Sequence, residues 1–206
     1  MSTPPSPENL AAALQSSTSS SLLQGIRQRD PEAWRRLTQL YEPTVLQWCL
    51  RAGLQSHDAA DVVQEVFRAV AAGIDRFRRE QAQDSFRGWI YGITQHKLRD
   101  HWRRQAKTPD AAGGTEAHLR LNELPVESLA SASSSTADAH GLFQRALELI
   151  RAQCEDRTWR AFWLLTVDER AAADVARELG MTTGAVYVAK SRVLNRLRSE
   201  LGDFLD

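Results

Sequence analysis

The sequence has few cysteines and no long apolar run, and these absences exclude several classes of protein. Its 206 residues contain two cysteines, Cys49 and Cys154, which lie far apart and outside any CxxC pair or histidine cluster. We therefore expect no disulfide framework and no metal site, and we interpret both thiols as small buried side chains. No apolar stretch approaches the roughly eighteen residues that a transmembrane helix needs, so we expect a cytoplasmic protein without membrane insertion.

The chain also lacks an excess of either charge. A formal net charge of +0 at first argues against a nucleic-acid partner, which usually requires a basic surface. The distribution argues otherwise, because residues 76–107 contain nine Lys/Arg against three acids and residues 181–198 contain four basic residues and no acid. Acidic residues gather in segment 58–65 and between residues 110 and 138. Opposed patches in one neutral chain predict two different partners.

Composition divides the chain into four parts. Residues 1–20 are rich in Ser, Pro and Ala and are predicted to form a disordered tail. Residues 106–140 combine Pro, a Gly pair and a Ser tract, which is typical of a flexible linker, with one short ordered patch expected near residues 119–124. The remaining units, 21–105 and 141–206, are small enough that each should be a compact helical bundle with one modest core.

Apolar residues recur at helical spacing, and no period-two alternation indicates strands. Asp30 and Pro31 are predicted to begin one helix as its N-cap and first residue, and Ser56 to cap the next. Asp84 and Ser85 should open a third helix, which runs to residue 105. The apolar faces of the second and third helices are predicted to contain Val62, Val63, Val66, Phe67, Val70, Phe86, Trp89, Ile90 and Ile93. The expected fold class is all-α, with two small bundles on a flexible linker.

The C-terminal unit contains the strongest local signal, a predicted helix-turn-helix. Residues 172–179 form a short helix rich in small residues, Gly180 can adopt the left-handed turn, and Thr182 can cap the next helix. An ordinary hairpin with a solvated basic face is the alternative, but the coincidence of turn, cap and acid-free helix favours DNA contact. The residues predicted to hold the second helix to the bundle are Val186, Val193, Leu194 and Leu197. The residues left for the major groove and its phosphates are Thr182, Thr183, Tyr187, Lys190, Ser191, Arg192 and Arg196.

A basic, aromatic helix over residues 89–105 is the second functional signal. Aromatic rings can stack on unpaired bases while Lys or Arg holds the backbone, so this combination suits opened DNA. The alternative makes Trp89 and Trp102 core anchors and the arginines a solubilising face. The core role is favoured for Trp89, and both roles stay open for Trp102.

A third feature is the polar face of the helix that begins near Ser56. It presents Asp61, Gln64, Glu65 and Arg68. Charged faces of amphipathic helices are usually only solvated, so the residues alone favour that interpretation over a binding role.

Three segments together resemble the extracytoplasmic-function (ECF) sigma factors, the smallest group of the bacterial sigma-70 family. These are residues 58–67 (DAADVVQEVF), 85–105 (SFRGWIYGITQHKLRDHWRRQ) and 171–198 (AAADVARELGMTTGAVYVAKSRVLNRLR). Their order and separation match throughout the chain outside the linker. The resemblance implies that the first segment binds the clamp helices of the polymerase β′ subunit, through the face of Asp61, Gln64, Glu65 and Arg68.

The resemblance also assigns the other two segments. The second is similar to the element that reads and melts the minus-ten region, with the loop before Phe86 receiving a flipped base. Its implied strand-binding residues are His96, Lys97, Arg99, Asp100, Trp102, Arg103 and Arg104. The third is similar to the reader of the minus-35 element. His96 stands where the family often has Asn, and Tyr187 and Ala189 where Arg or Lys is common, which leaves the promoter sequence open.

The sequence therefore predicts a sigma factor whose partners are core RNA polymerase, through β′ and β, and promoter DNA, both duplex and single-stranded. An anti-sigma factor is a further candidate partner, and no cofactor is expected. The alternative is a helix-turn-helix regulator with an N-terminal dimerisation or sensing domain, which leaves the basic aromatic helix unexplained. An enzyme is rejected, because the pairs His57 with Asp58 or Asp61, and His96 with Asp100, lack a nucleophile, a phosphate loop and a full ligand set.

Overall fold

The computed structural model describes residues 21–78, 85–106 and 136–201 and is helical, with no strand in these ranges. The predicted all-α class is confirmed. The predicted tail over residues 1–20 and the ordered patch near residues 119–124 lie outside the described residues. The contacts divide the chain into two compact units, Arg29–Ala139 and Met1–Gln28 with His140–Asp206, and each is described by itself.

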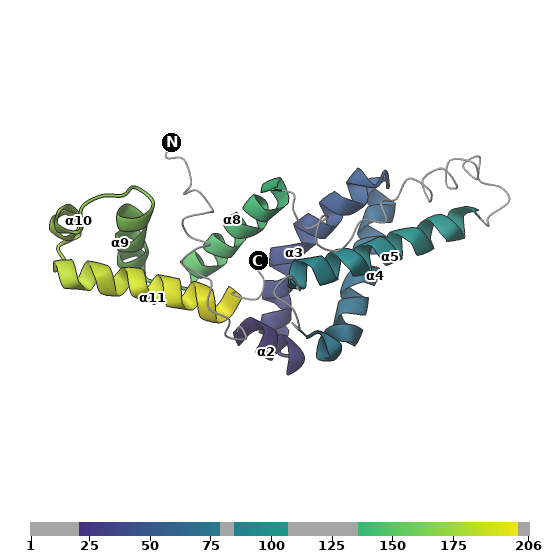
Figure 1. Cartoon of the computed structure of the whole chain (residues 1–206), viewed down its shortest axis with the longest axis horizontal. Coiled ribbons are helices and arrows are strands. Elements are labelled where there is room, and N and C mark those ends of the chain that lie inside the picture. Colours follow the sequence, from purple (N-terminus) through teal and green to yellow (C-terminus); the bar gives the residue numbers. More distant parts are fainter. Residues whose placement is uncertain (1–20, 79–84, 107–135, 202–206) are drawn as a thin grey trace. The chain divides into compact units, whose positions relative to one another are not determined.

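The unit Arg29–Ala139 is built on three long helices (Figure 1). They are α3 (Pro31–Arg51), α4 (Ser56–Gly73), which continues into the 3-10 turn η1 (Ile74–Arg76), and α5 (Phe86–Ala106). Each of the three long helices packs against the other two. Their facing apolar residues form the core, which includes Leu37, Leu40, Tyr41, Val45, Val62, Val66, Ile90 and Leu98.

Of the two predicted caps in this unit, that of Asp30 forms and that of Ser56 does not, and Ser85 stands at the start of the third helix as predicted. The Asp30 carboxylate accepts hydrogen bonds from the backbone N–H groups of Glu32 and Ala33 at 3.1 and 3.3 Å, ahead of Pro31. The Ser85 hydroxyl accepts from the N–H of Gly88 at 3.0 Å. The prediction for Ser56 is wrong: Gln55 is the N-cap in extended backbone conformation, and its side chain makes no capping bond.

Aromatic rings fill the space where α5 begins. Phe86 packs edge-on against Tyr41 and Phe77, and Trp89 lies against both Phe77 and Phe86 with ring centroids 5.1 and 5.5 Å away. Phe86 is buried and Trp89 half-buried. The core role predicted for Trp89 is therefore confirmed.

A buried polar cluster in the same unit was not predicted. Asp138, in the first turn of α8 (Thr136–Ala152), accepts a hydrogen bond from the indole N–H of Trp48 at 2.9 Å and pairs with Arg51. The Arg87 guanidinium lies 3.7 Å from the same carboxylate, and both side chains are almost completely buried. The linker was predicted to extend to residue 140, but its last residues are helical and hold a buried carboxylate.

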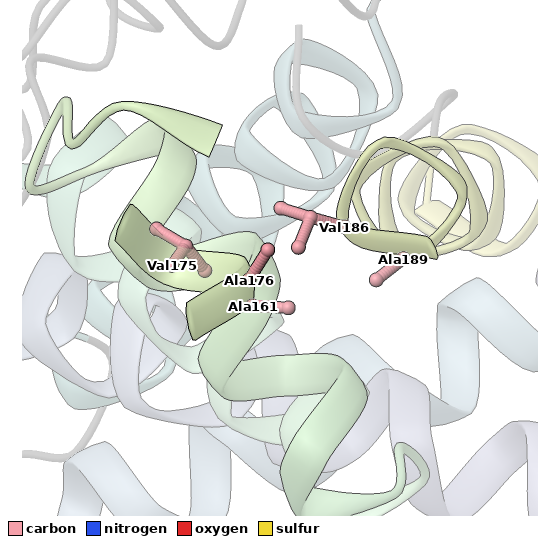
Figure 2. Packing of buried hydrophobic residues seen from close by; sticks show 5 residues of the cluster. All are labelled: Ala161, Val175, Ala176, Val186 and Ala189. Atoms are coloured by element: carbon pink, nitrogen blue, oxygen red, sulfur yellow. The ribbon is translucent and has the colours of Figure 1, made fainter. Parts of the chain in front are cut away.

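The second unit contains α2 (Ser21–Arg27), α9 (Asp156–Thr166), α10 (Ala172–Leu179), α11 (Thr183–Leu201) and α8 from His140 onward. α11 packs on α9, α10 and α2. The sequence placed residues 21–27 in the N-terminal bundle, whereas their contacts group α2 with the C-terminal helices. Small side chains meet between α9, α10 and α11, as Figure 2 shows for Ala161, Val175, Ala176, Val186 and Ala189.

The two thiols differ in exposure. Cys49 is buried in α3, as predicted, but Cys154 is only half-buried after α8, so the prediction for it is wrong. Burial raises the pKa of the Cys49 thiol to about 12. Among the described helices, none combines the length and apolar character needed to cross a bilayer.

Candidate nucleic-acid interface

The turn between α10 and α11 has the predicted geometry. Gly180 ends α10 at φ 60° and ψ 43°, in the left-handed region that glycine adopts at little cost. The N–H of Met181 returns to the Ala176 carbonyl at 2.8 Å, and the Thr182 hydroxyl accepts from the N–H of Ala185 at 3.1 Å. Both the left-handed glycine and the Thr182 cap are confirmed.

Arg157 on α9 holds this turn from outside. Its guanidinium donates to the carbonyl of Leu179 at 2.6 Å and to that of Gly180. These carbonyls end a helix, where a cation is favourable because of the helix dipole. Arg157 thus ties α9 to the turn, a role that sequence reasoning missed because the two sites are more than twenty residues apart.

α11 separates its packing face from its exposed face. Val186, Val193 and Leu197 are buried as predicted, whereas Leu194 is only half-buried. Arg196 is exposed and donates to the carbonyl of Gln153 at 3.1 Å. Lys190 is half-buried. The other residues predicted to face the major groove are all exposed: Thr182, Thr183, Tyr187, Ser191 and Arg192.

The C-terminal half of α5 presents charged side chains along one side, whereas Arg87 in its first turn is buried. His96, Arg103 and Arg104 are exposed, and Lys97, Arg99 and Asp100 are half-buried. Asp100 lies 3.4 Å from the His96 imidazole and 3.7 Å from the Arg103 guanidinium. This side of α5 can therefore hold a phosphodiester backbone over several residues.

Trp102 lies on the other side of α5. Only 7% of it is exposed, and its ring meets that of His101 edge-on at 5.3 Å. A ring so deeply buried offers little surface for stacking on a base, so this conformation favours the core role left open by the sequence. Its assignment to minus-ten DNA stays a prediction.

The polar face of α4 has two parts. Asp61, Gln64 and Arg68 point to solvent, with Asp61 65% exposed and a hydrogen bond of 3.1 Å from Arg68 to Gln64. Glu65 is 27% exposed and turns toward α5, where its carboxylate lies 3.1 Å from Arg104 and 3.9 Å from Lys97. A residue predicted for polymerase thus neutralises two residues predicted for DNA.

A shallow hollow between α4 and α5 is lined by five charged side chains: Glu65, Lys97, Asp100, Arg103 and Arg104. The sequence separates Glu65 from Arg104 by 39 positions, so only the packing of α4 on α5 brings them together. The loop before Phe86, predicted to receive a flipped base, falls in residues 79–84, outside the described residues.

The histidines on α4 and α5 were also considered in the sequence as candidates for acid–base or metal chemistry. His57 lies 3.7 Å from Asp61 and 3.8 Å from Asp58, all on one exposed turn of α4. Across the described ranges, no group of three His, Cys, Asp or Glu side chains converges as metal ligands would. Burial lowers the pKa of Arg87, although the neighbouring Asp138 works in the opposite direction.

Comparison with known proteins gives this architecture a class. Residues 37–108, which include most of α3 and all of α4 and α5, match sigma-70 region 2. The chain is 32% identical over 190 residues to the ECF RNA polymerase sigma factor SigD of Mycobacterium tuberculosis, which covers 85% of this chain and 81% of that relative. It is 24% identical over 185 residues to SigW of Bacillus subtilis, which is also named an ECF RNA polymerase sigma factor. That match covers 86% of this chain and 94% of the relative. For ShbA of Streptomyces griseus, which has the same description, the identity is 27% over 177 residues, with 82% and 88% covered.

The match to sigma-70 region 2 and the similarity to these relatives thus place the chain in the class of sigma factors for transcription initiation. The chain belongs to the ECF sigma factors of the sigma-70 family. Sigma factors bind core RNA polymerase and promoter DNA, and they are not a class of enzymes. The alternative of a helix-turn-helix regulator is not favoured.

Proposed function

We propose that three faces of this sigma factor divide the work of initiation. The exposed part of α4 binds core RNA polymerase, the basic side of α5 holds the separated minus-ten strand, and α11 enters the major groove at the minus-35 element. The protein contributes binding and no catalysis of its own, and acts in the cytoplasm beside polymerase. An anti-sigma factor that covers one of these faces is a further proposed partner.

The observation that carries the proposal is the sorting of side chains on α11. Most of its apolar residues are buried, with Val186 and Ala189 packed against α9 and α10, while the hydroxyls, the phenol and the guanidinium predicted for DNA are exposed. Residues 181–198 contain Lys and Arg but no acidic residue, and the helix follows a tight turn. Both features suit the major groove and its flanking phosphates.

The assignment for α5 depends on charge and shape together. The cations in its C-terminal half lie along one side, within reach of a single backbone, and the aromatic cluster of Phe77, Phe86 and Trp89 fixes the start of the helix. Polymerase binding is assigned to Asp61, Gln64 and Arg68, because these side chains extend from α4 into solvent.

Run-off transcription with purified core polymerase tests the proposal. The wild-type chain should direct RNA synthesis from a promoter template, and Lys190→Ala with Arg192→Ala should abolish it while core binding persists. Asp61→Lys should instead lose core binding, measured by co-purification. If the wild-type chain never yields promoter-directed RNA on genomic fragments, the proposal fails. If it forms a stable dimer that binds duplex DNA without polymerase, the regulator alternative is correct.

A further inference from the structure

Val188 on α11 is a large apolar side chain left in solvent. It is 49% exposed, and its neighbour Tyr187 is also exposed. Valine is a weaker helix former than alanine and gains nothing from exposure to water, so neither helix propensity nor packing accounts for it. Val188 lines a hollow beside the turn, together with Arg157, Thr182, Ala185 and Arg192.

Gly184, one turn before Val188, is also unexplained by the chain itself. A Cβ atom built on it would approach only the Thr182 hydroxyl oxygen, at the ordinary contact distance of 4.0 Å, so nothing in the described structure fills that space. Its φ is not positive, in contrast to that of Gly180. Glycine within a helix costs up to about 1 kcal/mol relative to alanine. Gly184 is the second residue of α11, and the open space beside it leaves the backbone of this first turn accessible to an external molecule.

The two positions share one face of α11. Residues four apart lie above one another on a helix, so Gly184, Val188 and Arg192 form a single row. Along this row, Gly184 exposes its backbone, Val188 exposes two methyl groups and Arg192 exposes its guanidinium. Residues 181–198 contain no acid, and in the hollow beside Val188 the two cations Arg157 and Arg192 outnumber the one acid, Glu155, which suits a polyanionic partner.

We infer that Gly184 and Val188 form an apolar reading site for thymine in the minus-35 duplex. Gly184 allows the α11 backbone to approach the groove closely, and the Val188 methyl groups contact the 5-methyl group of one thymine. That methyl is the only apolar group that a base pair presents in the major groove, and it distinguishes thymine from the other bases. The inference rests on the proposed function of α11 and adds two residues that charge alone does not identify.

Replacing thymine by deoxyuridine tests this site, because the change removes only the methyl group. The upstream duplex is first obtained by selection from a random library with the assembled holoenzyme. The same holoenzyme is then titrated against labelled duplexes in which each thymine is replaced in turn. At one position wild-type affinity should fall about threefold to fivefold, the size expected for one buried methyl.

The variants identify the residue responsible. Val188→Ala should bind the thymine duplex as weakly as wild type binds the deoxyuridine duplex, and should not distinguish the two. Val188→Thr keeps one methyl and should retain discrimination. Leu50→Ala removes a side chain on α3 that is 43% exposed. This control should change neither the affinity for the thymine duplex nor the discrimination against the deoxyuridine duplex. If Val188→Ala still distinguishes thymine from deoxyuridine at the position where wild type does, the reading site is wrong.

Gly184→Ala separates a DNA contact from a structural role. Its melting temperature should equal or exceed that of wild type, since alanine favours the helix, while duplex affinity falls about tenfold. Unchanged affinity would overturn the close approach. If Lys190→Ala with Arg192→Ala also binds normally, the proposed function of α11 fails as a whole. If that double variant loses duplex affinity as expected while Gly184→Ala and Val188→Ala bind like wild type, only the present inference is overturned.

Discussion

The carboxylate of Glu65 on α4 lies 3.1 Å from the guanidinium of Arg104 on α5. The same carboxylate is 3.9 Å from the ammonium of Lys97, so one acid partly neutralises two cations on the side of α5 proposed to hold DNA. Within the free protein, Glu65 and a phosphodiester would compete for the same groups.

Glu65→Gln should strengthen binding of single-stranded DNA by the free protein about twofold to fivefold, because partly exposed ion pairs are worth up to about 1 kcal/mol. The salt dependence of binding should become steeper, since more phosphates can be neutralised. Fluorescence anisotropy with a labelled oligonucleotide at several salt concentrations measures both.

The matched control is Glu42→Gln, which makes the same charge change at an exposed position on α3. Arg104→Ala should reduce the effect of Glu65→Gln, because it removes the closer of the two cations. Equal gains from the changes at positions 42 and 65 would mean that net charge alone governs the affinity.

Asp138→Ala should lower the free energy of unfolding by about 3 kcal/mol. The change leaves the Arg87 cation buried without its carboxylate and the Trp48 indole without its acceptor. Arg51→Ala should cost less than about 1 kcal/mol, because that side chain reaches water. Urea denaturation followed by tryptophan fluorescence compares the two, and equal losses would show that the buried charge at Arg87 is not the cause.

Gly180→Ala should destabilise the C-terminal unit by about 1 kcal/mol, since alanine disfavours the left-handed conformation. Gly180→Asn should lose less, because asparagine tolerates that region better. Thermal unfolding followed by circular dichroism measures the difference. Equal melting temperatures for wild type and Gly180→Ala would contradict the proposed role of the turn.

Cys154 should react with iodoacetamide at pH 8 while Cys49 stays protected. The thiolate is the reactive form, and a pKa of about 12 leaves only about one Cys49 thiol in ten thousand ionised at that pH. Cys154 is half-buried and therefore more accessible. Mass spectrometry of the alkylated chain reads both positions, and urea should make them equally reactive. Labelling of Cys49 at the rate of Cys154 in native protein would refute the prediction.

Local signals predicted the parts of the fold that short sequence segments determine. Asp30 with Pro31, and Gly180 with Thr182, form the predicted caps and turn because a few neighbouring backbone groups decide their geometry. Ser56 shows where such rules stop, since its neighbour Gln55 occupies the capping position with no side-chain bond. The helices could be predicted because apolar residues at helical spacing are also a signal within a short segment.

Pairings across long stretches of chain were not predictable in this way. Arg87 in α5 reads as one more cation of a basic segment, and Asp138 as one more acid of the linker, yet the fold buries both together. Glu65 likewise faces α5 only because α4 and α5 pack. Short segments of sequence thus predict helices, caps and the turn, whereas the partners of individual side chains depend on tertiary contacts.

The Gly180 turn fixes the start of α11 through its left-handed backbone, the Arg157 guanidinium and the Thr182 cap. Apart from Thr182, the residues predicted to contact DNA on this face take no part in that support. Substituting them should therefore leave the position of the helix start unchanged.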